Sequence, residues 1–201
     1  MTSQPSPHTR FSSKYVEDLN DYVDFLNLLA YNDEDKVFYN SGPFHAAAVM
    51  GTMFNNAKYN VQVFSGGFTG EVSDKEIYLS GLKGFLDRPG VKLDVIIQDK
   101  SRIKKGRIFQ IFREYPSKVT LHFTDAKMRY SPSSDDDINP SPEQFLHFCI
   151  ADQKMYRLET DIKNYRAECN FNDPNMAGIL KNIFQQALSH NSTEEISVTN
   201  S

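Results

Sequence analysis

Residues 144–161 read QFLHFCIADQKMYRLETD, and this stretch decides the fold. From 145 to 151, apolar side chains occupy both alternating sets of positions, as in a strand that is covered on both faces. Asp152 and Gln153 then make a tight polar break. Residues 155–160 alternate as a second strand, which either returns beside the first or continues it. The stretch therefore predicts the centre of an α/β domain.

A third extended run and a helix follow this pair of strands. Residues 165–171 form the run, which leads into Asn172-Asp173-Pro174. Asp is a preferred N-cap residue, and Pro is well tolerated at the first helical position because its missing N–H would be unpaired there anyway. We therefore expect a helix over 175–188.

Upstream of this region the chain alternates between helical and extended patterns. The periodicity predicts, in order, helix 13–31, strand 37–39, helix 44–57, strand 59–65, helix 77–86, strand 91–98, helix 100–113 and strand 118–124. We therefore predict a single α/β domain with a mixed, mainly parallel sheet and helices on both faces, spanning 13–190. The polar ends, 1–12 and 191–201, are predicted to be flexible tails.

Length, charge and the lengths of apolar runs limit the classes of protein to which the chain can belong. The chain has 201 residues and a formal net charge of -4, which suits one well-buried domain and gives no overall signature of polyanion binding. No apolar run approaches the roughly 20 residues needed to span a membrane, and no apolar stretch follows the first residues. We expect a soluble cytoplasmic protein in which Cys149 and Cys169 are buried free thiols.

The order of elements carries a family resemblance. A buried strand with a His is followed by an Asp, a second strand, a third strand ending in Asn-Phe-Asn-Asp-Pro, and a helix with Ala177, Leu180 and Phe184. This order resembles the C-terminal half of a phospholipase D-like (HKD) domain. In that family the motif is His-x-Lys-x-x-x-x-Asp, whose His and Lys project toward a phosphodiester. The resemblance implies the family's fold over roughly residues 37–188.

The HKD motif itself is not complete in this chain. Placing Asp152 at the family's Asp puts His147 at its Lys position and Phe145 at its His position. Starting from His147 as the family's His puts Cys149 where Lys is expected and Lys154 where Asp is expected. Neither alignment restores the motif, so the resemblance supports the fold and argues against the family's chemistry.

The resemblance also predicts that the chain works together with a second subunit. Phospholipase D-like enzymes bring together two HKD halves, either within one chain or across a dimer. This chain supplies one half and has no internal repeat. The resemblance therefore implies a homodimer or a partner subunit.

The candidate catalytic residues are His147, Asp152 and Arg157. On its strand face His147 has apolar neighbours, which favours a hydrogen-bonded core residue over a nucleophile. Arg157 either clamps a phosphate with its planar guanidinium or pairs with Glu159 or Asp161, and we favour the pairing.

Two further segments are candidates for ligand binding. Ser65, Gly66 and Gly67 form a Gly-rich turn after a strand, although without the Lys-Ser/Thr of a P-loop. Lys104, Lys105 and Arg107 belong to a run of cations without an acid, which predicts a helix with a basic outer face. His and Cys lack zinc-site spacing, and we expect no metal and no cofactor.

Together these features favour a catalytically degenerate phospholipase D-like domain. We expect it to act as a binding, scaffolding or regulatory protein, for nucleic acid or a phosphorylated ligand. The alternative is an active phosphodiesterase or nuclease that uses His147 with non-standard partners.

Overall fold

The computed structural model describes residues 19–68, 70–102, 106–128 and 146–199. Their helices are α2 (Leu19–Tyr31), α3 (Pro43–Asn56), α4 (Glu76–Asp87), the 3-10 turn η1 (Lys100–Arg102), α5 (Arg107–Glu114) and α6 (Pro174–Leu188). Their strands are β1 (Phe38–Asn40), β2 (Asn60–Ser65), β3 (Lys92–Ile97), β4 (Val119–Phe123), β5 (Phe148–Ala151), β6 (Met155–Asp161), β7 (Arg166–Asn170) and β8 (Glu194–Ile196). The predicted tail 1–12 lies outside the described residues.

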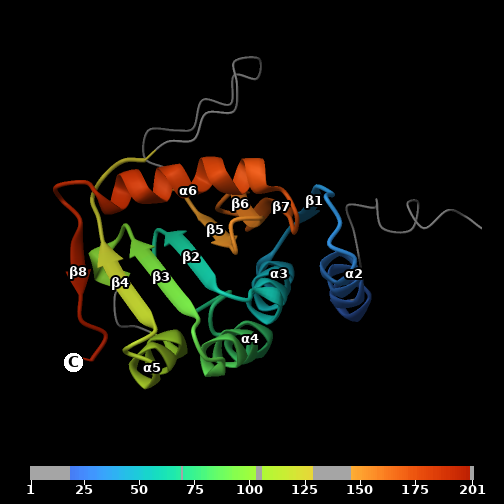
Figure 1. The fold of residues 1–201 in the computed structure, drawn as a ribbon, viewed down its shortest axis with the longest axis horizontal. Coiled ribbons are helices and arrows are strands. Elements are labelled where there is room, and N and C mark those ends of the chain that lie inside the picture. The colour runs from blue at the N-terminus through green and yellow to red at the C-terminus, as the bar shows by residue number, and fades with distance from the viewer. Residues whose placement is uncertain (1–18, 69, 103–105, 129–145, 200–201) are drawn as a thin grey trace, which may run out of the picture.

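The described strands form one mixed sheet in the order β1-β7-β6-β5-β2-β3-β4-β8 (Figure 1). Strands β2, β3 and β4 pair in parallel, with α4 and α5 in the crossover connections. The other five neighbouring pairs are antiparallel. The α/β class and the mixed sheet are confirmed, but the predicted majority of parallel pairs is not found among these strands.

The turn between β5 and β6 explains one of these antiparallel pairs. Asp152 and Gln153 have φ values of 51° and 57°. Two successive positive φ angles are those of a type I′ turn, whose twist matches that of an antiparallel hairpin. The second strand therefore returns beside the first, with Cys149 opposite Arg157.

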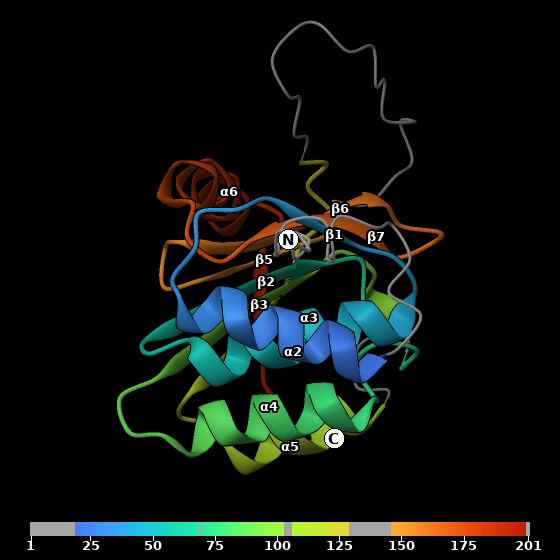
Figure 2. The same cartoon turned by 90° about the vertical axis from the view of Figure 1, so that its right-hand side faces the viewer.

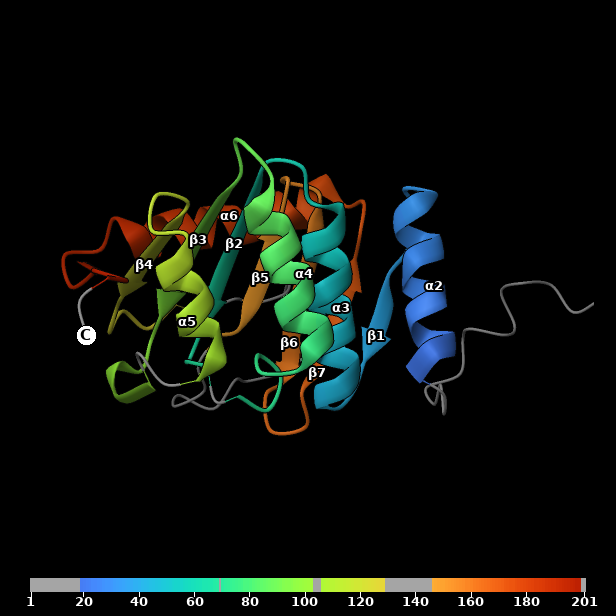
Figure 3. The same cartoon turned by 90° about the horizontal axis from the view of Figure 1, so that it is seen from below.

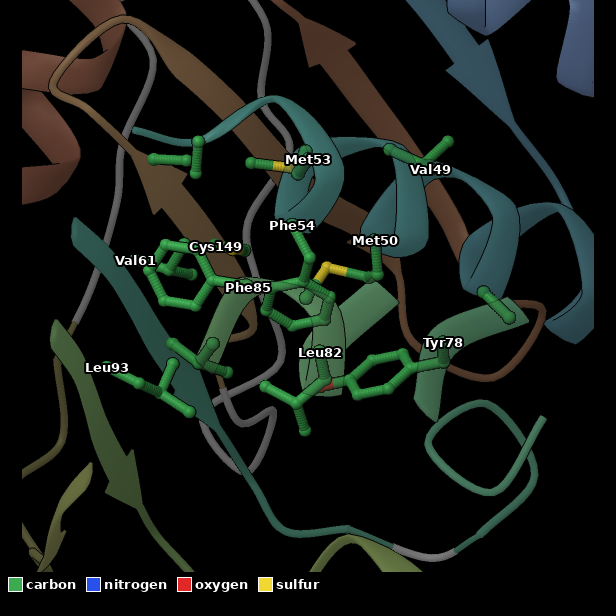
Figure 4. Packing of buried hydrophobic residues seen from close by; sticks show 14 of the residues in the cluster. Val49, Met50, Met53, Phe54, Val61, Tyr78, Leu82, Phe85, Leu93 and Cys149 are labelled. Atoms are coloured by element: carbon green, nitrogen blue, oxygen red, sulfur yellow. The ribbon is translucent and has the colours of Figure 1, made fainter. Parts of the chain in front are cut away.

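The sheet lies between two layers of helices (Figure 2). Helix α6 covers one face, where Phe64, Phe148 and Tyr156 pack with its apolar side. Helices α2 to α5 cover the other face, and their cluster includes Val61 and Val63. Figure 4 shows this second cluster, in which side chains from α3 and α4 meet those of the strands. Helices on both faces of the sheet are therefore confirmed, and they leave the central strands buried.

Helices α3 and α4 lie side by side along their length (Figure 3). A Cβ atom added to Gly51 would lie 2.5 Å from the Ile77 carbonyl oxygen, and one added to Gly81 would lie 2.9 Å from the Gly51 carbonyl oxygen. The two backbones thus approach so closely that only glycine fits at the crossing. This contact holds the loop before α4 against the end of the sheet that carries the site described below.

The start of helix α6 follows its sequence signal. Asp173 caps α6, since its carboxylate accepts the N–H of Met176, as predicted. Gly42 is the N-cap of α3, and Lys75 is the N-cap of α4. Neither of these two residues caps its helix with a side-chain hydrogen bond.

The segment after α6 also differs from its prediction as a flexible tail. Strand β8 pairs antiparallel with β4 at the edge of the sheet. The hydroxyl of Thr193 bonds the carbonyl of Ala187 and the hydroxyl of Thr124 at 2.6 and 2.8 Å, which ties the turn to the core. Among the described residues, no helix is both long and apolar enough to cross a membrane.

Candidate functional site

Three polar side chains meet on the face of the sheet that α3 and α4 cover. His147 directly precedes β5, while Arg157 and Glu159 lie on β6. The register places Arg157 opposite Cys149, and the N–H of Glu159 donates to the carbonyl of His147 at 2.9 Å. Paired residues of antiparallel strands point to the same face, so the hairpin brings all three side chains together.

Both ring nitrogens of His147 are engaged. Its Nε2 accepts the backbone N–H of Gly66 at 3.0 Å. Because Nε2 is the acceptor, the proton of the neutral ring is on Nδ1, which lies 3.0 Å from Glu159 Oε2. The ring therefore links the Gly-rich turn after β2 to strand β6.

Arg157 is enclosed by partners, with a side chain only 6% exposed. Its Nη1 lies 2.8 Å from Glu159 Oε1, and its Nε donates to Asn40 Oδ1 at 3.1 Å. Its Nη2 donates to the carbonyl oxygen of Tyr165 at 3.4 Å. The predicted pairing of this guanidinium is confirmed, with Glu159 rather than Asp161 as the acid.

Glu159 is the acid that both cationic groups share. Its side chain is 6% exposed. Burial by itself raises the pKa of this carboxyl, but the contact with His147 and the charge of Arg157 outweigh burial and hold the pKa below its ordinary value. The contact between Oε2 and His147 has a poor angle for a hydrogen bond, so Oε2 is left without a well-aligned donor.

These side chains line a pocket of about 130 Å³. Opposite the strands, the pocket is bordered by the segment between β2 and α4, including Gly67, Phe68 and Ser73. Tyr78 of α4 and Arg102 of η1 complete its lining. The site is therefore a small cavity with apolar walls and a few polar groups, as ligand pockets commonly are.

Asp152 does not belong to this pocket. It follows β5 at the end opposite His147. Its carboxylate accepts the backbone N–H groups of Lys58, Tyr59 and Asn60, the last two at 2.9 and 3.1 Å. Its carboxylate holds the start of β2 against the β5–β6 turn, so the structure places Asp152 apart from the other two candidates, His147 and Arg157.

The predicted Gly-rich turn borders the pocket. Ser65 and Gly67 are among its lining residues, and the Ser65 hydroxyl accepts the N–H of Gly67 at 3.1 Å. A Cβ atom at Gly67, where φ is 151°, would lie 2.7 Å from the side chain of Arg102. The backbone of the turn therefore packs against the side chain of Arg102, which also lines the pocket.

The predicted basic segment is described only in part. Lys104 and Lys105 lie outside the described residues. Arg107 begins α5, where its Nη1 lies 2.5 Å from Glu76 Oε1 and its backbone N–H donates to Asp74 at 3.0 Å. The basic character of this segment is therefore partly neutralised by acids at the start of α4.

Asn40, Ser73 and Arg102 are site residues that the sequence did not single out. Asn40 ends the edge strand β1, and Ser73 lies in the segment between β2 and α4. No local pattern marks these residues, because Ser73 and Arg102 line the pocket, and Asn40 binds Arg157, from segments far from residues 147–159. In the part of the chain that is described, no group of three or more His, Cys, Asp or Glu side chains is placed to hold a metal ion.

No protein-family model matches the chain, and no curated protein matches its sequence. Solved structures do match in three dimensions. NucT from Helicobacter pylori aligns over 81% of this chain and 100% of its own, with a TM-score of 0.53 and 16% identity. TrmBL2, an archaeal chromatin protein, aligns over 85% of this chain and 58% of its own, with a TM-score of 0.52 and 15% identity.

A third solved structure, phosphatidylserine synthase from Haemophilus influenzae, aligns over 81% of this chain and 39% of its own. Its TM-score is 0.50 and its identity is 10%. At such identities the likeness concerns the fold alone. NucT and the synthase support a phospholipase D-like fold for this chain, which agrees with the resemblance seen in the order of its elements.

Proposed function

We propose that this protein is a catalytically degenerate phospholipase D-like domain, which binds nucleic acid or a phosphorylated ligand at the pocket beside His147. One observation carries the proposal: Nε2 of His147 accepts the N–H of Gly66 at 3.0 Å. A lone pair engaged in this way is not free to attack phosphorus, and the other ring nitrogen bears the proton. Neither nitrogen is a nucleophile in this arrangement.

The surroundings of His147 support the same conclusion. A phosphoryl transfer needs cations that neutralise the charge on the phosphate oxygens. Arg157 is already paired with Glu159. The position of the family's Lys is occupied by His147 in one alignment of the motif and by Cys149 in the other. Cys149 is no substitute nucleophile, because burial raises the pKa of its thiol to about 12.

Hydrolysis of bis(p-nitrophenyl) phosphate and of a short single-stranded oligonucleotide tests the loss of chemistry. We expect the wild-type protein and the His147→Ala variant to show the same background rate. Hydrolysis that disappears only in His147→Ala would refute the proposal and establish the alternative, an active phosphodiesterase.

Binding of nucleic acid is tested separately by fluorescence anisotropy at low salt. We expect the triple change of Lys104, Lys105 and Arg107 to Glu to weaken oligonucleotide binding at least tenfold, since each lost cation removes a phosphate contact. A triple change of Lys36, Lys58 and Lys181 to Glu alters the net charge equally and is the control. Equal loss in both variants would show that only overall charge matters.

The resemblance also supports a homodimer or a partner subunit as part of this proposal. Sedimentation velocity checks it, with an expected mass of twice that of one chain. A monomer at micromolar concentration that gains no second copy on ligand addition would contradict it.

A further inference from the structure

Two buried oxygens without a well-aligned hydrogen-bond donor line the same pocket. Among the described residues, four buried side-chain nitrogen or oxygen atoms lack a hydrogen-bond partner, and two of these are Ser73 Oγ and Glu159 Oε2. Both residues line the pocket beside His147. A buried polar group without a partner costs about 1–3 kcal/mol, so two that line one cavity indicate a guest that supplies donors.

The acceptors define the chemistry of that guest. An ionised carboxylate oxygen such as Glu159 Oε2 only accepts hydrogen bonds. The charge of Glu159 is already balanced by Arg157, 2.8 Å away. The free oxygen of the carboxylate is therefore better matched by a neutral N–H or O–H donor on the guest than by a second cation. A phosphate is excluded at this position because its oxygens would face a carboxylate of the same charge.

The walls define the shape of the guest. Met50, Phe68, Val72 and Tyr78 supply apolar surface on the side away from the strands. The pocket volume of about 130 Å³ is roughly four times the ~30 Å³ that one water occupies in the liquid, so a guest larger than a single water fits. A planar heteroaromatic ring that carries N–H groups satisfies both the walls and the acceptors.

Arg102 could pair with an anionic group attached to that ring. Its side chain lines the pocket, is 42% exposed and lies 2.9 Å from Asp99. A half-exposed guanidinium can turn to a phosphate at the pocket mouth at little cost in desolvation. The pocket therefore offers acceptors inside and a cation toward solvent.

We propose that the pocket binds a nucleobase, whose N–H groups donate to Glu159 Oε2 and Ser73 Oγ while its phosphate lies at Arg102. Proteins commonly read a splayed base through hydrogen bonds to its edge and contacts with apolar or aromatic side chains. The base comes either from a free nucleotide or from a single strand. This inference rests on the proposed function, that the site binds rather than cleaves.

Isothermal titration with guanosine 5′-monophosphate tests the inference, with ribose 5-phosphate as the probe that lacks a base. We expect saturable binding of the nucleotide and at least tenfold weaker binding of ribose 5-phosphate. In Glu159→Gln the oxygen of the amide faces Arg157 and its NH₂ faces the guest, so nucleotide binding should fall at least tenfold. Ser73→Ala, a smaller change for the fold, should weaken binding severalfold, whereas the exposed Ser80→Ala should leave it unchanged.

The possible outcomes separate the two proposals. Equal binding of guanosine 5′-monophosphate and ribose 5-phosphate overturns the nucleobase while leaving a phosphate-binding domain. No saturable binding of either probe, or of a single-stranded oligonucleotide, means that the pocket holds water only, and overturns the inference. Tighter binding of the oligonucleotide than of the nucleotide, lost in Ser73→Ala, identifies a strand as the source of the base. Hydrolysis that depends on His147 overturns the proposed function itself.

Discussion

Glu159 determines the electrostatics of the pocket because it is the only acid that both Arg157 and His147 contact there among the described residues. One oxygen pairs with the guanidinium at 2.8 Å, and the other lies 3.0 Å from the imidazole. The side chain is 6% exposed, so water screens these interactions little. Removing the acid would leave a buried guanidinium without its counter-charge, a loss that costs more than the pair contributes when intact.

The lowered pKa of Glu159 predicts how stability depends on pH. A carboxyl whose pKa is lower in the folded state stabilises the fold above its unfolded pKa, near 4.5, and loses that contribution as pH falls through the folded value. We expect Glu159→Gln to lower the free energy of unfolding by about 3–5 kcal/mol at neutral pH, with the deficit shrinking below about pH 4.5. Urea unfolding across this pH range measures it.

Glu114→Gln is the control for this measurement, because Glu114 pairs with Lys83 at the surface, where both side chains are more than half exposed. Such pairs contribute about 0–1 kcal/mol, so its effect should be small at every pH. A deficit in Glu159→Gln that stays constant down to pH 3 would contradict the electrostatic account.

At the scale of elements, the pocket depends on how closely α3 and α4 pack. Gly51 and Gly81 let the two backbones touch, and this contact positions the segment that carries Ser73 and Tyr78 over the strands. Arg88, just after α4, donates to the carbonyls of Phe54 and Ala57 at the end of α3. The helix pair is therefore tied together at its crossing and at one end.

Alanine substitutions at two glycines test this packing. In Gly51→Ala the new methyl group would meet the Ile77 carbonyl at 2.5 Å, so we expect a loss of about 1–3 kcal/mol in the free energy of unfolding. Gly84, also in α4, has nothing within 4 Å of an added Cβ. There alanine should stabilise by about 0.5–1 kcal/mol through its helix propensity. Thermal unfolding of both variants measures the contrast, and equal shifts would contradict close packing.

For the molecule as a whole, the two helical layers enclose the sheet and both cysteines. Cys149 on β5 and Cys169 on β7 are buried free thiols, as predicted. Burial is the main cause that raises the pKa of each thiol to about 12. At pH 8 both are therefore protonated and shielded, and they become reactive only when the layers separate.

Thiol labelling then reports the opening of the whole domain. With Ellman's reagent at pH 8 we expect no fast reaction of the native protein and two thiols per chain after unfolding in guanidinium. The variant Ser80→Cys, at an exposed position of α4, should add one thiol that reacts at once. Rapid labelling of a native cysteine would mean that the sheet opens locally.

Elements with local signals could be predicted from the chain before its structure was known. Apolar residues on both faces mark β5, and Asp173 followed by Pro174 marks the start of α6. The family resemblance, which rests on the order of these elements, also predicted the fold. Such features depend only on the types and spacing of a few neighbouring residues, which are visible in the sequence.

Only the tertiary structure decided how these elements meet. The sequence left open whether β6 returns beside β5, and it did not separate Glu159 from Asp161 as the partner of Arg157. The first depends on the turn between the two strands. The second depends on the irregular pairing of β6 with β7 between Glu159 and Asp161, after which Asp161 bonds Asn164. The hydrogen bond from Gly66 to His147 spans 81 positions, and the one from Arg157 to Asn40 spans 117. Contacts over such separations exist only once the chain has folded, because no local pattern encodes which distant groups will share a pocket.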